Sequence, residues 1–347
     1  MIQLDRMSSN IFHRAIEFQH PGTIPCLVSE RLDLSWLQDQ DPEKISRLRE
    51  LQALFPHDFI ELGDCWTDSP INRRIGRGRW FDEWGVEWIN EGCGSKVIGH
   101  PLQYGYDSLK DFSFPDPNRT DRFQEAESLL KQREERYCRG RVWFTLFERL
   151  WMLRGFSDLL MDPYTEPEGF SHLRDRILEI NLQMIDLWLE RGVDAVYFSD
   201  DWGSQRSLLI NPEDWRRLYK PAYGTMFRKA RDGGAHVWMH LCGNISEILP
   251  DLVDLGLNVL NPVQPQALDV YALSRDFGGR ICFNGGIDVQ ATMVRGKPED
   301  VKKEVHTMVH LFGRFDGGYI GGMSHSIMPE TPLDNIIAVY EAFAEYL

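Results

Sequence analysis

The sequence predicts an α/β protein that folds as a single (β/α)8 TIM barrel with an insertion after the second strand. The chain has 347 residues, which is enough for such a barrel, since this fold typically needs about 250 residues plus insertions. From Arg141 onward, short β-prone runs alternate with amphipathic helices, as in proteins with a parallel sheet. Two earlier runs bring the strand count to eight, which favours a closed barrel over an open sheet.

The elements follow one another in a regular order. The eight β-prone runs are 24–29, 58–62, 142–146, 195–199, 235–240, 258–262, 281–284 and 318–322. Helical patterns occupy 168–191, 212–231 with Asn211 as a plausible N-cap, 245–255, 298–312 and 332–346. Segment 64–115 interrupts the alternation, is rich in Trp, Gly and Arg, and has β-prone pieces around 79–90. We therefore predict an insertion there, within one domain spanning 1–347.

Composition excludes several classes of function. The net charge of −15 argues against nucleic acid or an anionic membrane surface as the main partner. No apolar run approaches the roughly 20 residues of a membrane span, and the charged N-terminus does not resemble a signal peptide. Six scattered cysteines are too few for a disulfide scaffold of this size. We therefore expect a cytoplasmic protein, and the charge is compatible with an acidic enzyme that meets either a small molecule or a basic patch on another protein.

Polar residues are concentrated just after the predicted strands, where TIM-barrel active sites lie. They are Asp200, Asp201 and Gln205 after the fourth run, His240 and Cys242 at and after the fifth, Gln264 after the sixth, Asn284 at the end of the seventh and His325 after the eighth. Helix capping accounts for roughly half of such Asp, Asn and Ser residues. Capping does not require paired Asp, His or Cys, so these residues indicate a site.

His240 and Cys242 form the most informative motif. Side chains two apart on a strand point to the same face, and zinc accepts both imidazole and thiolate. His325 is the leading third ligand, because it lies in the last strand-to-helix loop, and Asp200, Asp201 or an exogenous group completes the set. The alternative is that His240 makes a hydrogen bond inside the barrel and Cys242 packs as a small hydrophobic residue.

These residues lie in segments that resemble the uroporphyrinogen decarboxylase superfamily. The matching segments are Phe198-Ser-Asp-Asp-Trp-Gly203, Asn211-Pro-Glu-Asp-Trp215, Lys220-Pro221, His240-Leu-Cys-Gly-Asn244, Phe283-Asn-Gly-Gly-Ile-Asp288, and Gly318-Tyr-Ile through His325-Ser-Ile-Met-Pro-Glu-Thr-Pro332. Asp82-Glu-Trp-Gly85 also looks like a stretch common among the methyltransferases of this superfamily. The resemblance implies the same (β/α)8 barrel.

Within the superfamily, the resemblance is nearest to the cobalamin-dependent (corrinoid) methyltransferases. True uroporphyrinogen decarboxylases carry an Arg-x-x-Gly-Arg-type segment near the N-terminus that binds the acidic porphyrinogen, and region 23–31 lacks it. Thiol-methylating members bind zinc through a His-x-Cys pair and a distant Cys in the last loop. His240 and Cys242 match the pair, whereas the distant position holds His325. This difference alters the site charge by one unit, so the resemblance does not fix a thiol as the acceptor.

The resemblance implies a zinc-dependent methyltransferase or demethylase that moves a methyl group between a small thiol, folate or methoxy substrate and a corrinoid protein. His240, Cys242 and His325 would bind zinc, and a separate partner would carry the cobalamin. We assign catalytic roles to Asp200 and Asp201. A substrate-binding role falls to Gln205, Gln264, Asn284 and Glu148.

Two other readings stay open. One is a decarboxylase-like lyase that uses Asp200 or Asp201 on a small carboxylic acid without metal. The other is a non-catalytic relative that binds a ligand. A homodimer is compatible with the resemblance, by analogy alone.

Overall fold

A seven-stranded parallel sheet forms the centre of the molecule. The computed structural model describes residues 10–28, 41–55, 58–63, 71–91 and 94–347. The strand order is β1-β6-β7-β8-β9-β10-β11, so each strand pairs with the next one of the sheet along the chain. These strands are β1 (Phe59–Leu62), β6 (Tyr137–Val142), β7 (Ala195–Ser199), β8 (His236–His240), β9 (Val259–Val263), β10 (Cys282–Ile287) and β11 (Tyr319–Met323).

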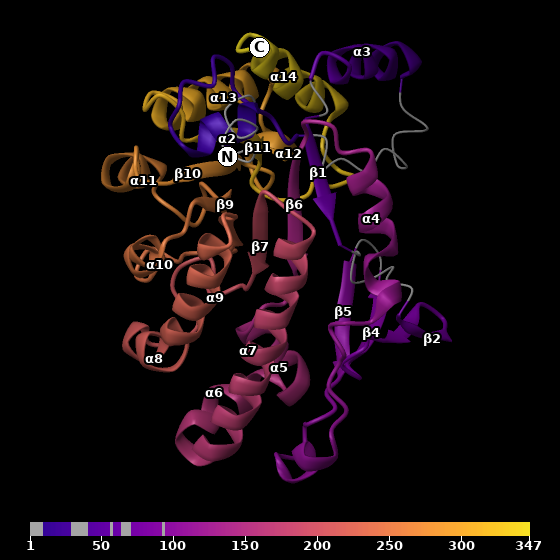
Figure 1. Ribbon diagram of the computed structural model, residues 1–347. Coiled ribbons are helices and arrows are strands. Elements are labelled where there is room, and N and C mark those ends of the chain that lie inside the picture. The colour runs from indigo at the N-terminus through magenta and orange to yellow at the C-terminus, as the bar shows by residue number, and fades with distance from the viewer. Residues whose placement is uncertain (1–9, 29–40, 56–57, 64–70, 92–93) are drawn as a thin grey trace.

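Helices follow the strands and cover the outside of the sheet. Strand direction changes progressively from β6 to β10, so the sheet curls toward a barrel (Figure 1). The helices are α2 (Ile11–Ile16), α3 (Pro42–Gln52), α4 (Gln124–Lys131), α5 (Phe147–Arg154), α6 (Phe156–Thr165), α7 (Pro167–Glu190), α8 (Pro212–Leu218), α9 (Lys220–Asp232), α10 (Leu249–Leu255), α11 (Val270–Phe277), α12 (Thr292–Arg295), α13 (Pro298–Phe312) and α14 (Leu333–Ala344). Two short 3-10 helices span Asp107–Asp111 and Thr120–Phe123.

The first predicted strand, 24–29, is much shorter than expected. Within the described residues it makes a single parallel bridge, between Cys26 and Gly321 of β11. The Leu27 amide donates to the Gly321 carbonyl at 2.8 Å, and the Gly321 amide donates to the Pro25 carbonyl at 2.8 Å. This segment therefore lies beside β11 at the edge of the sheet, where an eighth barrel strand would be. Residue 29 lies outside the described residues.

The third predicted strand, 142–146, is wrong in position, because β6 ends at Val142. The sequence of β6, Tyr-Cys-Arg-Gly-Arg-Val, looks too polar for a buried strand. Arg139 is nevertheless buried, since it forms an ion pair with Glu61 of β1. Its guanidinium carbon also lies 4.2 Å from the Tyr197 ring centre and 4.4 Å from that of Trp238. The ion pair and the aromatic faces make burial of this cation tolerable.

Two predicted helices have different bounds. The pattern at 212–231 forms two helices, α8 and α9, which meet at Tyr219. Pro221 has no backbone N–H, so it cannot donate the hydrogen bond that would extend α8. The predicted helix 245–255 begins only at Leu249, because residues 246–248 form a turn. The Asn211 cap is confirmed, since its side chain accepts from the Glu213 amide at 2.8 Å. Helices 168–191, 298–312 and 332–346 match α7, α13 and α14 within two residues.

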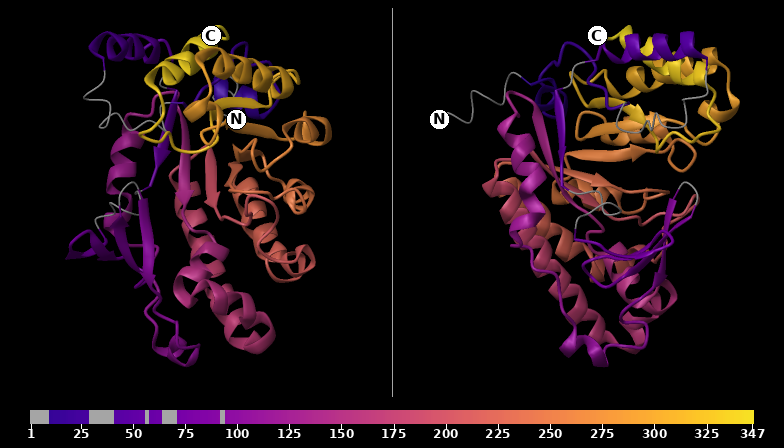
Figure 2. Two further views of the ribbon diagram at one scale, coloured as in Figure 1. Left: turned by 180° about the vertical axis from the view of Figure 1, so that it is seen from behind. Right: turned by 90° about the vertical axis from the view of Figure 1, so that its right-hand side faces the viewer.

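Segment 64–115 contains a separate antiparallel sheet, as its β-prone pieces indicated. Its order is β2 (Arg73–Gly76), β3 (Arg79–Phe81), β4 (Glu87–Glu91) and β5 (Gly94–Gly99). This sheet lies next to the parallel sheet in all three ribbon views (Figures 1 and 2). Residues 64–70 and 92–93 of the segment lie outside the described residues. That the segment is an insertion into the family's barrel stays a prediction.

Helix α2 packs against the amino ends of the strands. Its Phe12, Ala15 and Ile16 share a buried cluster with inward-facing strand residues. The strand members of this cluster are Tyr137, Ala195, Tyr197, Trp238, Val259, Cys282 and Ile320. Cys282 therefore belongs to the core. Among the described residues, no helix is both long and apolar enough to cross a membrane.

The buried ion pair between Glu61 and Arg139 gives a stability prediction. Burial opposes ionisation of Glu61, yet Arg139 and Arg141 lower its pKa below the ordinary value. Glu61→Ala leaves Arg139 buried without its carboxylate, so we expect a loss of about 3–5 kcal/mol in the free energy of unfolding. The double variant Glu61→Leu, Arg139→Met should recover most of this loss. Urea denaturation measures both, and a loss below about 1 kcal/mol in Glu61→Ala would contradict the account.

Glu304 of α13 gives a pH prediction. Burial raises the pKa of Glu304 from 4.5 to about 7. The carboxyl group therefore ionises in the unfolded chain at lower pH than in the folded protein, so stability falls as the pH rises between these values. We expect the urea midpoint to decrease from about pH 4.5 to about pH 7, and to decrease less in Glu304→Gln. An equal decrease in both proteins would show that Glu304 is not the group responsible.

Candidate functional site

His240 and Cys242 lie together at the carboxyl end of β8, as predicted. His240 is the last residue of the strand and is 8% exposed, whereas Cys242 is half-buried in the following loop. The His240 Nε2 atom lies 3.3 Å from Cys242 Sγ. Ligands in a tetrahedral zinc site with bonds of about 2.0–2.3 Å lie roughly 3.3–3.8 Å apart, so this separation is compatible with one shared metal ion.

His325 joins this pair from the loop after β11. Ligand atoms of His240, Cys242 and His325 all lie within 4.8 Å of one another. The imidazole rings of His240 and His325 are 6.3 Å apart between centres. His240 is buried, Cys242 intermediate and His325 exposed, so the cluster is open to solvent on the His325 side. Three ligands with one accessible side are typical of catalytic rather than structural zinc.

Asn261 of β9 orients His240. Its Oδ1 atom lies 2.8 Å from His240 Nδ1 and also accepts from the Tyr197 hydroxyl at 3.1 Å. Because an amide oxygen only accepts, His240 carries its proton on Nδ1 and presents the Nε2 lone pair toward Cys242. Such an outer hydrogen bond is the usual partner of a metal-bound histidine. The residues therefore fit a zinc ion.

Asn261 was missed by the sequence analysis, which treated 258–262 only as a strand. Its Nδ2 group donates to Asn284 Oδ1 at 2.5 Å, and Asn284 Nδ2 donates to the Ile320 carbonyl at 3.1 Å. Asn284, which we predicted to bind substrate, is thus buried behind Asn261 and fixes it. An amide inside an otherwise apolar strand is the signal that identifies Asn261.

Two glycines set the position of the Cys242 loop. The Gly203 amide donates to the Cys242 carbonyl at 3.1 Å, and the Asn244 amide donates to the Ser204 carbonyl at 2.7 Å. A Cβ atom on Gly243, whose φ is +82°, would lie 2.2 Å from the Gly203 carbonyl oxygen. The loops after β7 and β8 can approach this closely only because both positions lack a side chain.

Asp201 and Gln264 complete the surroundings of Cys242. Asp201 Oδ1 accepts from the Cys242 amide at 2.9 Å and lies 3.8 Å from His240 Nε2. Gln264 Oε1 accepts from the Gly243 amide at 2.6 Å, and its Nε2 lies 3.6 Å from Cys242 Sγ. Both predicted site residues therefore lie at the cluster. Asp201 is 40% exposed, so its carboxylate is accessible from outside.

Asp200 points away from the cluster. It is fully buried, and its carboxylate accepts from the amides of Leu146, Phe147 and Glu148 at 2.6–2.9 Å. The Tyr223 hydroxyl also donates to it. Asp200 therefore caps the amino end of α5 across the sheet, which is a structural task. Burial raises the pKa of Asp200 to about 6, although these hydrogen bonds oppose the increase. Its predicted catalytic role stays a prediction.

Glu148 lies at the start of α5 and is 8% exposed. The Ser199 hydroxyl donates to its Oε2 atom at 3.3 Å. Burial, followed by the negative charges of Asp201 and Asp200, raises the pKa of Glu148 well above its usual range. Glu148 therefore resists ionisation, and it lies next to the strand end from which Asp200 and Asp201 follow. Gln205, in contrast, is exposed in a turn of residues 204–207.

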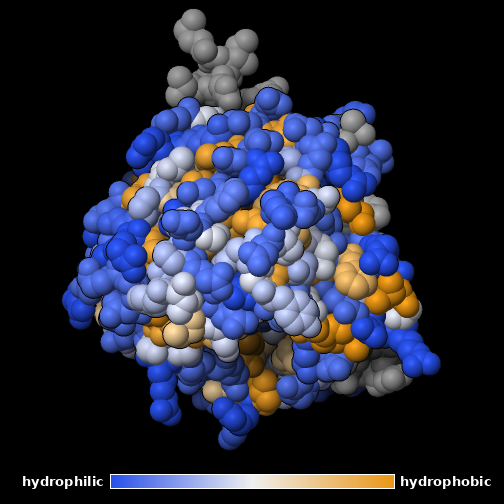
Figure 3. Space-filling view, turned by 90° about the horizontal axis from the view of Figure 1, so that it is seen from below, coloured by the Kyte–Doolittle hydropathy of each residue, from blue (hydrophilic) through white to orange (hydrophobic). Residues whose placement is uncertain are grey.

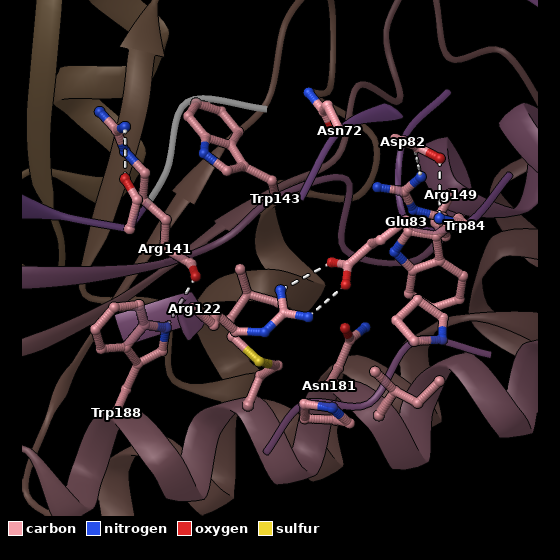
Figure 4. A pocket seen from close by; sticks show the side chains of 16 residues that line it. Asn72, Asp82, Glu83, Trp84, Arg122, Arg141, Trp143, Arg149, Asn181 and Trp188 are labelled. Carbon is pink, nitrogen blue, oxygen red and sulfur yellow. Dashed lines mark hydrogen bonds and ion pairs between the residues drawn. The ribbon is translucent and has the colours of Figure 1, made fainter. Parts of the chain in front are cut away.

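A well-defined cavity of about 120 Å³ lies apart from these residues, between the antiparallel sheet, β6 and α7 (Figure 4). Its charged side chains are already paired, since Arg122 binds both oxygens of Glu83 and Arg149 donates to Asp82 at 2.9 Å. Asp82 also accepts from the amides of Trp84 and Val86. The Asp82-Glu-Trp-Gly85 stretch thus joins the antiparallel sheet to α5, and the cavity includes none of the predicted site residues.

Comparisons with known proteins concern the family and the fold of the chain. The sequence model of the uroporphyrinogen decarboxylase (URO-D) family matches residues 144–346. The uroporphyrinogen decarboxylase of Coxiella burnetii strain RSA 493 is 20% identical over 186 residues, covering 53% of this chain and 49% of the relative. The enzyme of Geobacillus thermodenitrificans is 28% identical over 172 residues, covering 48% and 46%. The match thus spans about half the length of these curated relatives.

A solved structure has a similar fold along the whole chain. It is a methyltransferase from Methanosarcina mazei, with a TM-score of 0.69 and 17% identity, covering 97% of this chain and 99% of that one. At this identity the likeness concerns the fold, and it supports a barrel-like arrangement of the seven parallel strands.

The hydrogen bond from His240 to Asn261 predicts an effect on metal affinity. Asn261→Ala removes the acceptor that fixes the His240 ring, so we expect zinc affinity to fall by about 10–100-fold, measured by competition with a chromophoric chelator. Asn335→Ala is the matched control, because Asn335 is also a buried amide that donates to two carbonyls, at 2.9 and 2.8 Å, but from α14. Equal affinities in the two variants would contradict a role for Asn261.

Proposed function

The chain belongs to the uroporphyrinogen decarboxylase family, whose name describes only one of the reactions that a barrel fold can carry. We therefore propose a specific activity for this chain. It is a zinc-dependent methyltransferase that moves a methyl group between a small substrate and a corrinoid protein. The observation that carries this proposal is the convergence of one cysteine sulfur and two imidazole side chains, with ligand atoms within 4.8 Å of one another, at the carboxyl ends of the strands.

The ligand set favours activation of a nucleophile. His240, Cys242 and His325 would hold the zinc, which, when bound, stabilises the deprotonated form of a coordinated thiol or other heteroatom at neutral pH. Asp201 and Gln264 face the same opening and are placed to orient a polar substrate group. Glu148 would supply or retain a proton nearby, because burial and the charges of Asp201 and Asp200 raise the pKa of its carboxyl group well above the usual range.

The second partner would carry the cobalamin. Figure 3 shows the face toward which β6 and β7 run, where hydrophobic side chains are scattered among hydrophilic ones. A transient protein interface is on average about as apolar as the rest of a protein surface, so such a face suits a carrier protein that binds and leaves. The corrinoid partner, the methyl substrate, a homodimeric state and the cytoplasmic location stay predictions.

The alternative is a metal-free lyase that uses Asp200 or Asp201 on a small carboxylic acid. The geometry gives Asp200 little freedom for this, because four donors already bind its carboxylate. The net charge of −15 also disfavours a substrate with many carboxylates, since like charges repel. A ligand-binding relative without turnover is the third reading. Metal content and turnover distinguish the three.

Metal analysis of matched variants tests the proposal. We expect His240→Ala and Cys242→Ser each to lose one equivalent of zinc per chain relative to the wild type, and to lose methyl transfer from a panel of methyl donors with corrinoid protein. Cys26→Ser is the control, because Cys26 is also partly buried but lies beside Gly321 of β11 and is not a member of the cluster. Folding should be intact in all three by circular dichroism.

Two results would contradict the proposal. Wild-type zinc content and full turnover in Cys242→Ser would exclude the zinc mechanism. Turnover of a carboxylic acid by metal-free protein, lost in Asp201→Asn, would favour the lyase.

A further inference from the structure

A second cluster of metal-binding side chains lies at the opposite end of the barrel from Cys242. It consists of His13 and Glu17, at helix α2 and its C-terminal cap, and His236, the first residue of β8. We propose that these three side chains bind a divalent transition-metal ion, zinc in the first place, which fastens α2 to the amino ends of the strands. The inference is independent of the proposed function.

The ligand atoms already lie at suitable distances. His236 Nε2 is 3.2 Å from Glu17 Oε1, and His13 Nδ1 is 3.7 Å from the same oxygen. One ligand atom from each residue lies within 4.8 Å of the others. Two nitrogens and one carboxylate oxygen at such separations match the ligand types and spacing of zinc, whose bonds to them are about 2.0–2.2 Å.

His13 carries the strongest sign of a missing ligand. The residue is only 4% exposed, and its Nδ1 atom is buried without a hydrogen-bond partner. Its Nε2 atom lies 3.2 Å from Asp194 Oδ1, which as a carboxylate accepts the Nε2 proton. Nδ1 points toward Glu17 Oε1 at 3.7 Å, which is too far for a hydrogen bond. A buried polar atom without a partner costs free energy unless something binds it, and a metal ion between the three side chains would do so.

The surrounding residues match the usual outer contacts of a metal site. His13 would donate to Asp194, giving the carboxylate–histidine–metal arrangement common in zinc proteins. Asp194 is in turn bound by Arg133, so its charge is compensated. His236 Nδ1 lies 2.9 Å from the Tyr137 hydroxyl, which can accept the Nδ1 proton when Nε2 binds the metal. The Trp238 indole N–H fixes that hydroxyl at 3.1 Å.

The two sites are separate. His236 and His240 lie at opposite ends of the five-residue strand β8, about 13 Å apart along it at 3.3 Å per residue. The second cluster contains no thiolate, and Glu17 is 26% exposed, so water can supply a fourth ligand. A helix of six residues is too short to be stable alone, and a metal bound by α2 and β8 would hold it in place.

Stoichiometry of zinc in matched variants of the full chain, with any affinity tag removed, tests the inference. The probe is Zn²⁺ itself, quantified after dialysis, and Co²⁺ for absorption spectra. We expect Cys242→Ser to retain one equivalent, and Cys242→Ser with Glu17→Gln to retain none. Glu17→Gln keeps the shape of a half-exposed side chain, so it avoids removing a buried ring. His306→Gln in the Cys242→Ser background is the control for a surface histidine, since His306 lies on α13 and is 41% exposed.

Cobalt spectra distinguish the two sites directly. Co²⁺ in Glu17→Gln should show a thiolate charge-transfer band, and Co²⁺ in Cys242→Ser should show bands of a nitrogen and oxygen site alone. No metal in Cys242→Ser, or one equivalent retained after Glu17→Gln is added, would overturn the inference and leave the cluster as a group of ion pairs. If only the proposed function is wrong, the wild type should bind one equivalent of zinc per chain. Glu17→Gln should then remove this zinc, and Cys242→Ser should not.

Discussion

The curl of the parallel sheet is the constraint on which the site depends. All seven strands run the same way, so their carboxyl ends share one face. β8 and β11 are separated by two strands in the sheet, yet His240 and His325 come within ligand distance. This is possible only because the sheet bends round toward itself. Burial of Arg139 between Glu61 and the inner aromatic rings is part of what fills the space that the bend encloses.

Strand β8 links two chemically different ends of the molecule. At its carboxyl end, His240 is oriented by an amide oxygen and faces a cysteine sulfur. At its amino end, His236 lies beside a tyrosine hydroxyl and faces a carboxylate. The first cluster opens to solvent and suits reactivity, whereas the second joins a short helix to the sheet and suits stability. The neighbours of His240 and His236 thus suit the two histidines to different roles.

Sequence reasoning predicted the chemistry of the strand ends better than the strands themselves. The His-x-Cys spacing and the position of His325 were sufficient to place these three side chains together, because strand periodicity and loop order fix them. The strand at 137–142 was misplaced because its arginines look exposed until their partners are known. The roles of Asp200 as a helix cap and of Asn261 as a support for His240 depend on contacts between segments that are separate in sequence. The amide inside the apolar strand β9 singles out Asn261, but no pattern within one segment reveals the partner of either residue.

X-ray absorption at the zinc edge tests the central claim most directly. The Glu17→Gln variant loaded with zinc confines the signal to the cluster of His240, Cys242 and His325. The account predicts one sulfur neighbour at about 2.3 Å and imidazole nitrogens at about 2.0–2.1 Å, with the sulfur absent in Cys242→Ser. A first shell of nitrogen and oxygen alone in Glu17→Gln would contradict it, because the thiolate would then take no part in binding the metal.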